Sequence, residues 1–309
     1  MKCLVTGGAG FIGSFLCDRL LETGHEVVCI DNLVTGHKKN IAHLLSQPKF
    51  EFIEHDVTLP LPEAISASVI FHFASPASPP KYQKYAVETL LVNSIGTYYL
   101  LEKARVWQAK FIFASTSEVY GDPREHPQKE TYWGHVNPNG PRSCYDEAKR
   151  VGESFVATYI RKYQLDGRII RIFNTFGPRM DIDDGRVVTN FIKQILSRTP
   201  LTIQGDGSQT RSFCYISDLI EGIMSVFTTP AARGEVINLG NPEEKTILEL
   251  LNIIKKVSHY WGETVFLPLP EDDPLRRKPD ITKAQNLLHW EAKVGLEEGL
   301  TKTLEYFKK

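Results

Sequence analysis

A glycine-rich turn immediately after the first predicted strand constrains this chain more than any other feature of its sequence. Lys2–Thr6 is a short apolar run, and Gly7, Gly10 and Gly13 follow it with the spacing GxxGxxG before a helical pattern starts. In such a turn the glycines permit a tight bend, close approach of backbone N–H groups to a pyrophosphate, and close helix–strand packing. A glycine triplet alone is weak evidence. Its place between a strand and a helix predicts a dinucleotide site that includes Gly7, Gly10, Phe11 and Ile12.

Apolar runs alternate with amphipathic stretches through the first ~175 residues. Runs without internal alternation indicate strands buried on both faces, and their alternation with helices is typical of a parallel sheet with right-handed crossovers. We therefore predict an α/β fold with a Rossmann-type doubly wound parallel sheet. The predicted strands are Lys2–Thr6, Glu26–Asp31, Phe50–Glu54, Val69–Phe73, Lys110–Ser115 and Asp166–Ile172, and the predicted helices are Phe11–Thr23, Glu88–Val106 and Asp146–Tyr163.

The pattern changes after Pro178 and predicts a smaller α/β lobe that binds substrate. We expect residues 1–175 to form the cofactor-binding domain and residues 176–309 the second lobe, with part of residues 211–240 returning to the first domain. Asp218 is expected to cap a helix over Leu219–Phe227. The other expected elements are helices at Asn190–Ser197 and Leu248–Val257, strands at Leu201–Ile203, Arg211–Tyr215 and Val236–Leu239, and a helical tail over Asp280–Phe307.

Charge and cysteine content narrow the classes of partner. The 309 residues carry 36 Lys and Arg against 37 Asp and Glu, a formal net charge of −1, which argues against binding to nucleic acid or to a membrane surface. No apolar run reaches the roughly 18 residues of a membrane span, and the first strand begins too early for a leader peptide. The five scattered cysteines favour reduced core residues of a cytoplasmic protein, and no metal-ligand spacing occurs, so we expect no metal.

The end of the second predicted strand indicates which dinucleotide is bound. Asp31 lies where a carboxylate accepts hydrogen bonds from adenosine ribose hydroxyls and repels a 2′-phosphate, so NAD is favoured over NADP. Asn32, Thr35 and Gly36 follow it, and no cation occurs before His37-Lys38. Asp56-Val57, after the third strand, is placed to hold the adenine edge, although Asp56 could also be a solvated strand end.

The catalytic hypothesis rests on a tyrosine and a lysine spaced to share one face of a helix. Tyr145 and Lys149 form YxxxK, and a phenol has a pKa near 10 unless an ammonium group nearby stabilises the phenolate. The pair could then act as a base near neutral pH. YxxxK alone is common, but Ser115-Thr116-Ser117-Glu118 ends an apolar strand upstream. There a hydroxyl such as that of Thr116 can bind the substrate oxygen that Tyr145 deprotonates.

Several longer segments resemble the extended short-chain dehydrogenase/reductases and, more narrowly, the UDP-glucuronate decarboxylases. The resemblance runs through nearly the whole chain. Its most specific segments are Ala74–Pro80, Ser115–Pro123, Tyr132–Pro138, Cys144–Glu147, Arg171–Met180, Asp184–Val188 and Arg277–Ile281. It implies that C4 of UDP-glucuronate is oxidised by bound NAD, that the resulting β-keto acid loses CO2, and that the 4-keto pentose is reduced to UDP-xylose. NAD is thereby recycled.

The resemblance also implies roles for individual residues. Glu118 would orient the ring or relay a proton through water, and Arg277 would anchor the carboxylate and then a water that protonates C5. Asn174 and Arg186 match substrate-binding positions, and Arg211 is placed to bind the diphosphate with its planar guanidinium. Gln204 and Tyr215 are weaker candidates for ribose and uracil contacts. Further cofactor contacts are expected at Ser75, Ala114, Tyr145, Lys149 and Thr175.

The chain departs from the family pattern at one position, and several other activities of the same fold remain as alternatives. Several relatives carry a lysine linked with substrate handling where this chain has Leu91. A 4-epimerase shares the first step but needs neither Glu118 nor Arg277, and a 4,6-dehydratase typically has an Asp where Ser117 stands. An apiose/xylose synthase also remains open. A non-catalytic NAD-sensing protein is disfavoured because Thr116, Tyr145 and Lys149 are all present.

Two amphipathic helices, Glu88–Val106 and Asp146–Tyr163, predict a homodimer. Members of this fold class usually pair through two helices per subunit, and apolar residues stand on these two segments, including Tyr98, Tyr99, Phe155 and Tyr159. The same apolar stripes could instead belong to the core of a monomer.

Overall fold

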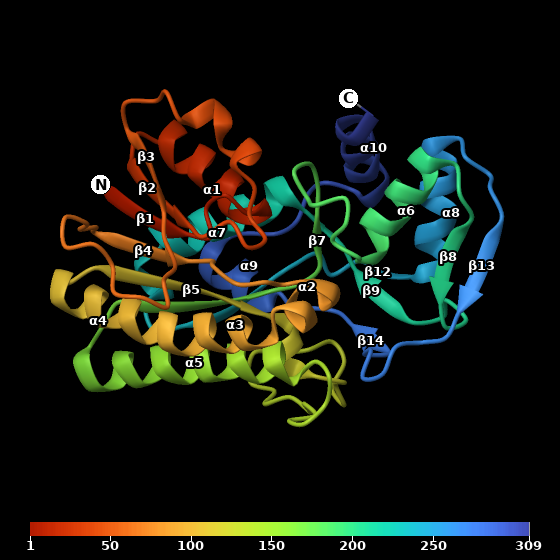
Figure 1. Ribbon diagram of the computed structural model, residues 1–309. Coiled ribbons are helices and arrows are strands. Elements are labelled where there is room, and N and C mark those ends of the chain that lie inside the picture. The colour runs from red at the N-terminus through yellow and green to blue at the C-terminus, as the bar shows by residue number, and fades with distance from the viewer. Residues whose placement is uncertain (309) are drawn as a thin grey trace.

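The computed structural model describes residues 1–308 and places a seven-stranded parallel sheet at the centre of the larger lobe (Figure 1). The strand order is β11-β6-β5-β4-β1-β2-β3. β2 and β3 are added on one side of β1, and β4 and the later strands are added on its other side, so the topological switch point lies between β1 and β4. Such a switch point opens a crevice at the carboxyl ends of the strands. The strands are β1 (Lys2–Thr6), β2 (Glu26–Asp31), β3 (Phe50–Glu54), β4 (Val69–His72), β5 (Lys110–Thr116), β6 (Gly167–Ile172) and β11 (Val236–Leu239). The predicted fold class is confirmed.

Each central strand is buried on both faces because successive side chains point to opposite sides of the sheet. In β1, Cys3 and Val5 join one apolar core while Leu4 joins another. One face is covered by α1 (Phe11–Glu22), α7 (Ile216–Thr228) and α9 (Thr282–Leu288). The other is covered by α4 (Thr97–Trp107) and α5 (Ser143–Tyr163), with α3 (Ala86–Leu91) beside α5.

The predicted helix over Glu88–Val106 is a longer helical run with an internal irregularity. It consists of α3, one π-helical turn η3 (Val92–Gly96) and α4. π-helical turns occur often at functional sites. Here the turn carries Asn93, whose side-chain amide donates to the Ser75 hydroxyl at 2.9 Å and so ties the helix to the loop after β4.

The smaller lobe lies at the right of Figure 1 and contains two small sheets with flanking helices. Its apolar core is continuous with the α1 side of the main sheet. The elements are α6 (Val187–Ser197), β8 (Leu201–Gln204), β9 (Thr210–Ser212), β12 (Glu244–Thr246), α8 (Ile247–Ser258), β13 (Thr264–Leu267), β14 (Arg276–Arg277) and α10 (Leu296–Lys308). Short segments complete the chain: α2 (Pro79–Lys84), β7 (Thr175–Phe176), β10 (Cys214–Tyr215), and the turns η1 (Lys38–Asn40), η2 (Ala42–Leu44), η4 (Ser117–Tyr120) and η5 (Pro230–Ala232).

Residues 211–240 are divided between the two lobes. β9 pairs with β12 and β14 in the smaller lobe, whereas α7 packs on α1 and β11 extends the main sheet beside β6. The predicted strand Arg211–Tyr215 is two short strands with different partners, because β10 pairs with β7. α9, beyond residue 240, also packs on the larger lobe against β11 and α7.

The predicted helix cap at Asp218 is wrong. α7 begins at Ile216, and Asp218 lies inside its first turn. Its carboxylate accepts hydrogen bonds from the backbone N–H groups of Lys293 and Val294, each at 2.8 Å. Asp218 therefore fastens the segment between α9 and α10 to the main body, a long-range contact that local sequence does not reveal.

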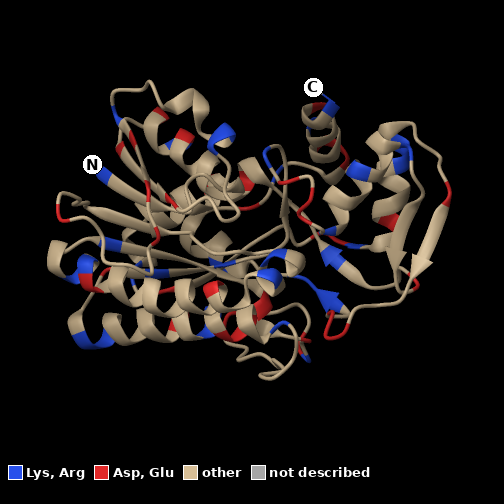
Figure 2. Cartoon of the chain, in the orientation of Figure 1, with Lys and Arg blue, Asp and Glu red and all other residues tan. Residues whose placement is uncertain are grey.

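Charged residues are interspersed over both lobes, as Figure 2 shows. Among residues 1–308, no helix combines the length and apolar character required to cross a bilayer. His, Cys, Asp and Glu side chains of that range form no group suited to a metal ion. All five cysteines, which fall within it, are free thiols.

Candidate active site

A cavity of about 450 Å³ lies at the carboxyl edge of the sheet and extends under the smaller lobe. Its volume is within the range usual for ligand pockets in proteins. Most of the predicted site residues line it: Gly7, Gly10, Phe11, Ile12, Asp31, Asn32, Thr35, Gly36, Asp56, Ser75, Ala114, Thr116, Glu118, Tyr145, Lys149, Asn174, Thr175, Arg186, Gln204 and Arg211. Val57, Tyr215 and Arg277 do not.

The three residues outside the cavity wall are held by packing. Val57 belongs to the core on the α4 side of the sheet, and its side chain lies beside Gly96, where a Cβ would be 3.3 Å from Val57 Cγ2. The Tyr215 ring packs edge-on against Phe176, with ring centroids 5.6 Å apart. Its expected ribose or uracil contact therefore has no support from its position. Arg277 is buried behind Glu118, which does line the cavity.

The glycine turn forms a cradle that fits a dinucleotide pyrophosphate. Gly7 has φ +71°, and a Cβ there would lie 2.7 Å from the backbone of Ala74. A Cβ on Gly13 would lie 2.1 Å from the Gly7 carbonyl oxygen. α1 begins directly after this turn, and Gly10 offers no side-chain cap for the helix. Its free N–H groups and positive dipole end are suited to an anion.

The carboxylate of Asp31 organises the loop beside this cradle. It accepts hydrogen bonds from the backbone N–H groups of Ala9 at 3.0 Å and Leu33 at 2.8 Å. A Cβ on Gly36 would lie 2.7 Å from the same carboxylate, so glycine leaves the space that Asp31 needs. Asn32 donates to Asp56 at 3.1 Å. The adenosine side of the cavity is thus bordered by carboxylates, which suits ribose hydroxyls and disfavours a further phosphate.

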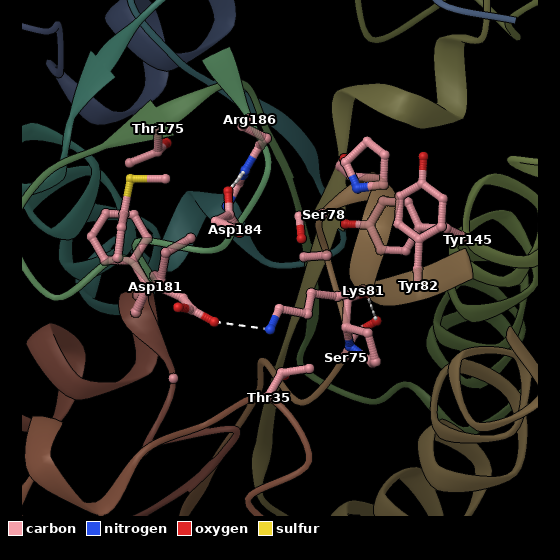
Figure 3. A pocket seen from close by; sticks show the side chains of 18 of the residues that line it. Thr35, Ser75, Ser78, Lys81, Tyr82, Tyr145, Thr175, Asp181, Asp184 and Arg186 are labelled. Atoms are coloured by element: carbon pink, nitrogen blue, oxygen red, sulfur yellow. Dashed lines mark hydrogen bonds and ion pairs between the residues drawn. The ribbon is translucent and has the colours of Figure 1, made fainter. Parts of the chain in front are cut away.

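Tyr145 and Lys149 lie near the N-terminus of α5 and close the cavity beside the end of β5. Figure 3 shows Tyr145 next to Tyr82; their rings stack with centroids 4.9 Å apart and planes 1° from parallel. Lys149 donates to the Ala114 carbonyl at 2.7 Å, and its ammonium lies 5.8 Å from the Tyr145 ring centroid. The lysine therefore sits over the ring and is hydrogen-bonded to the backbone.

Burial opposes charge on both members of this pair. It raises the pKa of Tyr145 well above its usual value, while a hydrogen bond with Thr116 acts in the opposite direction. Burial lowers the pKa of Lys149 to about 7, against the attraction of Glu153. Without substrate the phenol is therefore protonated, and Lys149 is the group that titrates near neutral pH. The expected resting phenolate is not favoured, because no hydrogen bond from the ammonium compensates for its desolvation.

Glu118 is held between two arginines. Its Oε2 lies 2.6 Å from Arg142 Nη2, and its Oε1 lies 2.5 Å from Arg277 Nη1. Burial alone would raise the pKa of Glu118, but Arg277 and Arg142 outweigh it and hold that pKa far below its usual range. A carboxylate fixed in this charged form can accept hydrogen bonds and orient a group, but it is a poor proton donor. The relay role expected for Glu118 is therefore less suited to it than the orienting role.

The smaller lobe supplies cations to the other end of the cavity. Arg186 pairs with Asp184, as Figure 3 shows, and Arg211 Nη2 lies 2.8 Å from Asp273 Oδ2. Asn174 follows β6, whose end faces the cavity. The Gln204 backbone carbonyl accepts a hydrogen bond from Gln209 at 2.6 Å. Arg186 and Arg211 are each paired with a carboxylate, and their guanidinium groups are of the type that binds phosphate oxygens.

Sequence reasoning missed several residues that shape the cavity: Lys81, Tyr82, Arg142, Asp181 and Asp273. Arg142 could have been identified from the sequence, because it stands three residues before Tyr145 and so lies on the same side of the start of the helix. No local sequence pattern indicates Lys81 or Asp181. They come from distant segments and meet across the cavity, with Lys81 Nζ 2.9 Å from Asp181 Oδ2 (Figure 3).

The chain belongs to the NAD dependent epimerase/dehydratase family, whose sequence model matches residues 3–240. UDP-glucuronic acid decarboxylase 1 of Danio rerio is 52% identical over 308 residues, which cover 100% of this chain and 73% of that protein. UDP-glucuronic acid decarboxylase 1 of Arabidopsis thaliana is 50% identical over 308 residues, covering 100% and 70%. The resemblance to this group is confirmed.

A solved structure of the same family has a closely similar fold. UDP-glucuronic acid 4-epimerase from Bacillus cereus, in complex with UDP-glucuronic acid and NAD, matches with a TM-score of 0.89 and 34% identity. The match covers 100% of this chain and 99% of that chain. NAD is the cofactor of this family, and the glycine cradle and Asp31 loop fit it.

The Lys81–Asp181 ion pair should slow the release of NAD, because it joins α2 to the loop before α6 across the cavity. Asp181→Asn is expected to speed release of bound NAD by up to about fivefold, as for a partly exposed ion pair worth about 1 kcal/mol or less. Stopped-flow displacement of NAD measures this rate. Asp183→Asn is the matched control, since Asp183 pairs with Lys193 outside the cavity. Equal release rates in the two variants would show that the bridge has no such role.

Proposed function

We propose that this chain converts UDP-glucuronate to UDP-xylose and CO2, with NAD regenerated in every cycle. Relatives about 50% identical over the whole chain are UDP-glucuronic acid decarboxylases. The observation that carries the proposal is the position of Glu118. It lines the cavity two residues after Thr116, near Tyr145, and is fixed by two arginines. A simple 4-epimerase has no need for this cluster.

The residues of the chain perform the proton transfers and the positioning. Bound NAD supplies the reversible two-electron oxidation and reduction of the sugar at C4. Tyr145 removes the proton of the C4 hydroxyl while its own phenol proton passes to neutral Lys149, and Thr116 hydrogen-bonds the same C4 oxygen. Once C4 is a ketone, the carboxylate on C5 is β to it. The bond between C5 and the carboxyl carbon then breaks, and its electron pair is delocalised onto the C4 oxygen, where Tyr145 and Thr116 can donate hydrogen bonds.

The proposed cofactor contacts divide into two groups. The glycine turn and the N-terminus of α1 would hold the pyrophosphate, and Asp31 and its loop the adenosine. Lys149 and Tyr145, together with Ser75, Ala114 and Thr175, would hold the nicotinamide half. Arg186 and Arg211 would hold the UDP diphosphate, with Asn174 and Gln204 beside it. All of these residues border one cavity, so one bound pair of molecules could contact them together.

Product analysis tests the activity directly. Protein incubated with NAD and carboxyl-labelled UDP-glucuronate should release labelled CO2 and an equal amount of a UDP-pentose, with no net NADH, as read by mass spectrometry. UDP-galacturonate without CO2 would instead establish an epimerase, and UDP-apiose an apiose/xylose synthase. Absence of any turnover with NAD bound would favour a sensing protein.

A variant pair ties that activity to the proposed base. Tyr145→Phe removes only the hydroxyl and should lower turnover by roughly 100-fold or more while NAD still binds. Tyr163→Phe, on the exposed side of the same helix α5, is the control and should keep normal turnover. Near-normal activity of Tyr145→Phe would contradict the assignment.

The pH dependence of C4 oxidation should follow the Tyr145–Lys149 pair. Below the Lys149 pKa of about 7 both groups are protonated and no base is present. Above it the pair has lost one proton, so the rate should rise with pH through about 7 and then level off. In Lys149→Met only the buried phenol remains, and the rise should move roughly two or more pH units upward.

Nicotinamide absorbance in single-turnover mixing of NAD-loaded protein with UDP-glucuronate gives this profile. Lys162→Met, a change of an exposed lysine on the same helix, should leave the profile where it is. An unshifted profile in Lys149→Met would mean that another group sets the pH dependence.

We also propose a homodimer formed through α4 and α5. Apolar side chains on α4, on the adjoining turn η3 and on α5 remain exposed: Ile95 of η3 is 40% accessible, Tyr98 of α4 42% and Val151 of α5 41%. The rings of Tyr98 and Phe155 lie 6.3 Å apart and join the two elements into one surface. Tyr159 does not belong to it, because its ring is buried and its hydroxyl donates to Glu102. A second copy of this chain would cover such a surface.

Light scattering coupled to size exclusion tests the assembly. The natural chain should have the mass of a dimer, and Tyr98→Glu should have that of a monomer. Trp261→Glu, at an exposed aromatic residue of the other lobe, should remain dimeric. A monomeric natural chain would refute the proposal, and so would a dimeric Tyr98→Glu.

A cytoplasmic location is proposed on the basis of the free thiols. Cys3, Cys17, Cys29, Cys144 and Cys214 carry no disulfide, as is usual in a reducing compartment. Fluorescence of a tagged chain in its host cell would test this, and accumulation in a secretory compartment would contradict it.

A further inference from the structure

Three arginines and two carboxylates form one buried cluster at the substrate end of the cavity. Glu118 pairs with Arg142 and Arg277, and Asp273 pairs with Arg211 at 2.8 Å and with Arg142 at 3.4 Å. The cluster joins η4, the start of α5, β9 and β14, the basic strand coloured blue in Figure 2. Arg142 stands at its centre, because it contacts both carboxylates.

This cluster has one positive charge in excess. Within residues 1–308, three guanidinium groups share the two carboxylates of Glu118 and Asp273. Asp146, the next acidic residue of α5, adds little negative charge, because burial and the nearby Glu118 raise its pKa to about 8. Buried charges are ordinarily paired, so one further anion would balance the charge of the cluster.

Arg142 and Arg277 differ in their access to the cavity. Arg142 lines the cavity wall and is 8% exposed, whereas Arg277 is 1% exposed and lies behind Glu118. Arg277 is also occupied by the protein, since it donates to the Gly121 carbonyl at 2.7 Å and to the Ser117 hydroxyl at 3.3 Å. Of the two arginines that pair with Glu118, Arg142 is therefore the one that a ligand in the cavity can reach.

Two hydrogen-bond donors near Glu118 lack an acceptor. The Tyr82 hydroxyl is buried on the cavity wall and has no hydrogen-bond partner in the described chain. Arg142 and Glu118 are among the charges that act on this hydroxyl. Arg142 Nε is likewise unpaired within residues 1–308. An unpaired buried donor costs free energy, and a bound acceptor would remove that cost.

We propose that Arg142, together with the Tyr82 hydroxyl, receives the carboxylate of the sugar ring and makes the site select a uronate over a sugar without that group. The inference rests on the proposed function and deepens it. Arg277 is then a positioning residue that holds Glu118 and ties β14 to the loop after η4. The uronate carboxylate supplies the missing anion, and its oxygens meet the unpaired donors.

Such a contact should act on binding more than on the chemical step. The carboxylate leaves as neutral CO2, so an ion pair with Arg142 stabilises bound substrate and becomes weaker as the bond to C5 breaks. Loss of Arg142 should therefore raise KM for UDP-glucuronate more than it lowers kcat. If Arg142 only oriented Glu118, its loss would lower kcat as well. It would also weaken the binding of nucleotides with and without a carboxylate to the same extent.

Calorimetric binding to NAD-loaded protein tests the inference without turnover as the readout. Arg142→Gln should weaken UDP-glucuronate binding about tenfold or more, as for a lost charged hydrogen bond, and change UDP-xylose binding by less than about twofold. Arg161→Gln, an exposed arginine on the same helix, is the matched control and should change neither. Arg277→Gln should weaken both nucleotides alike.

Equal weakening of both nucleotides by Arg142→Gln would overturn the inference, as would a selective loss in Arg277→Gln. Tyr82→Phe keeps the ring stacking and removes only an unpaired hydroxyl, so it keeps the test available if Arg142→Gln does not fold. It should weaken UDP-glucuronate alone, by several-fold; unchanged binding of both nucleotides would contradict the shared site. Failure of the natural chain to bind UDP-glucuronate at all would count against the proposed function itself.

Discussion

The paired charges around Glu118 hold together the parts of the molecule on which the site depends. Glu118 follows β5 of the main sheet, Arg142 precedes α5, and Arg277 belongs to β14 of the smaller lobe. Burying three such charges is costly unless each is well paired. The arrangement therefore fixes the end of the sheet, the helix that carries Tyr145 and the smaller lobe relative to one another.

The catalytic pair shows a different use of burial. Tyr145 and Lys149 both lose stability as ions when water is removed, so the pKa of Tyr145 rises, that of Lys149 falls, and the two values move apart. Lys149 therefore loses its proton near neutral pH, while the phenol of Tyr145 keeps its own.

Much of the larger lobe could be predicted because its strands are uniformly apolar. β1, β2 and β3 have the predicted bounds, since turns flank all three runs and the side chains on both faces of β1 and β2 are largely buried. The glycine turn, Asp31 and the Tyr145–Lys149 spacing are equally local signals. Each of them lies on the cavity wall as expected.

The features that could not be predicted depend on contacts between distant segments. Asp218 reads as a helix cap but binds the backbone near Val294, and Lys81 meets Asp181 only in the folded chain. Arg277 was expected in the substrate site because its motif resembles the family, yet its side chain is buried behind Glu118. Local patterns identify residue types suited to a site, but tertiary packing decides which of them face the ligand.

The place of β11 at the edge of the main sheet bears on how the protein is made. The strand that covers β6 comes from residues 236–239, and α9, which packs on it, comes later still. A ribosome therefore exposes the unpaired edge of β6 while dozens of further residues are being added. Unpaired edges invite aggregation during synthesis. The larger lobe can reach its native form only after most of the polypeptide has emerged, so the two lobes mature together.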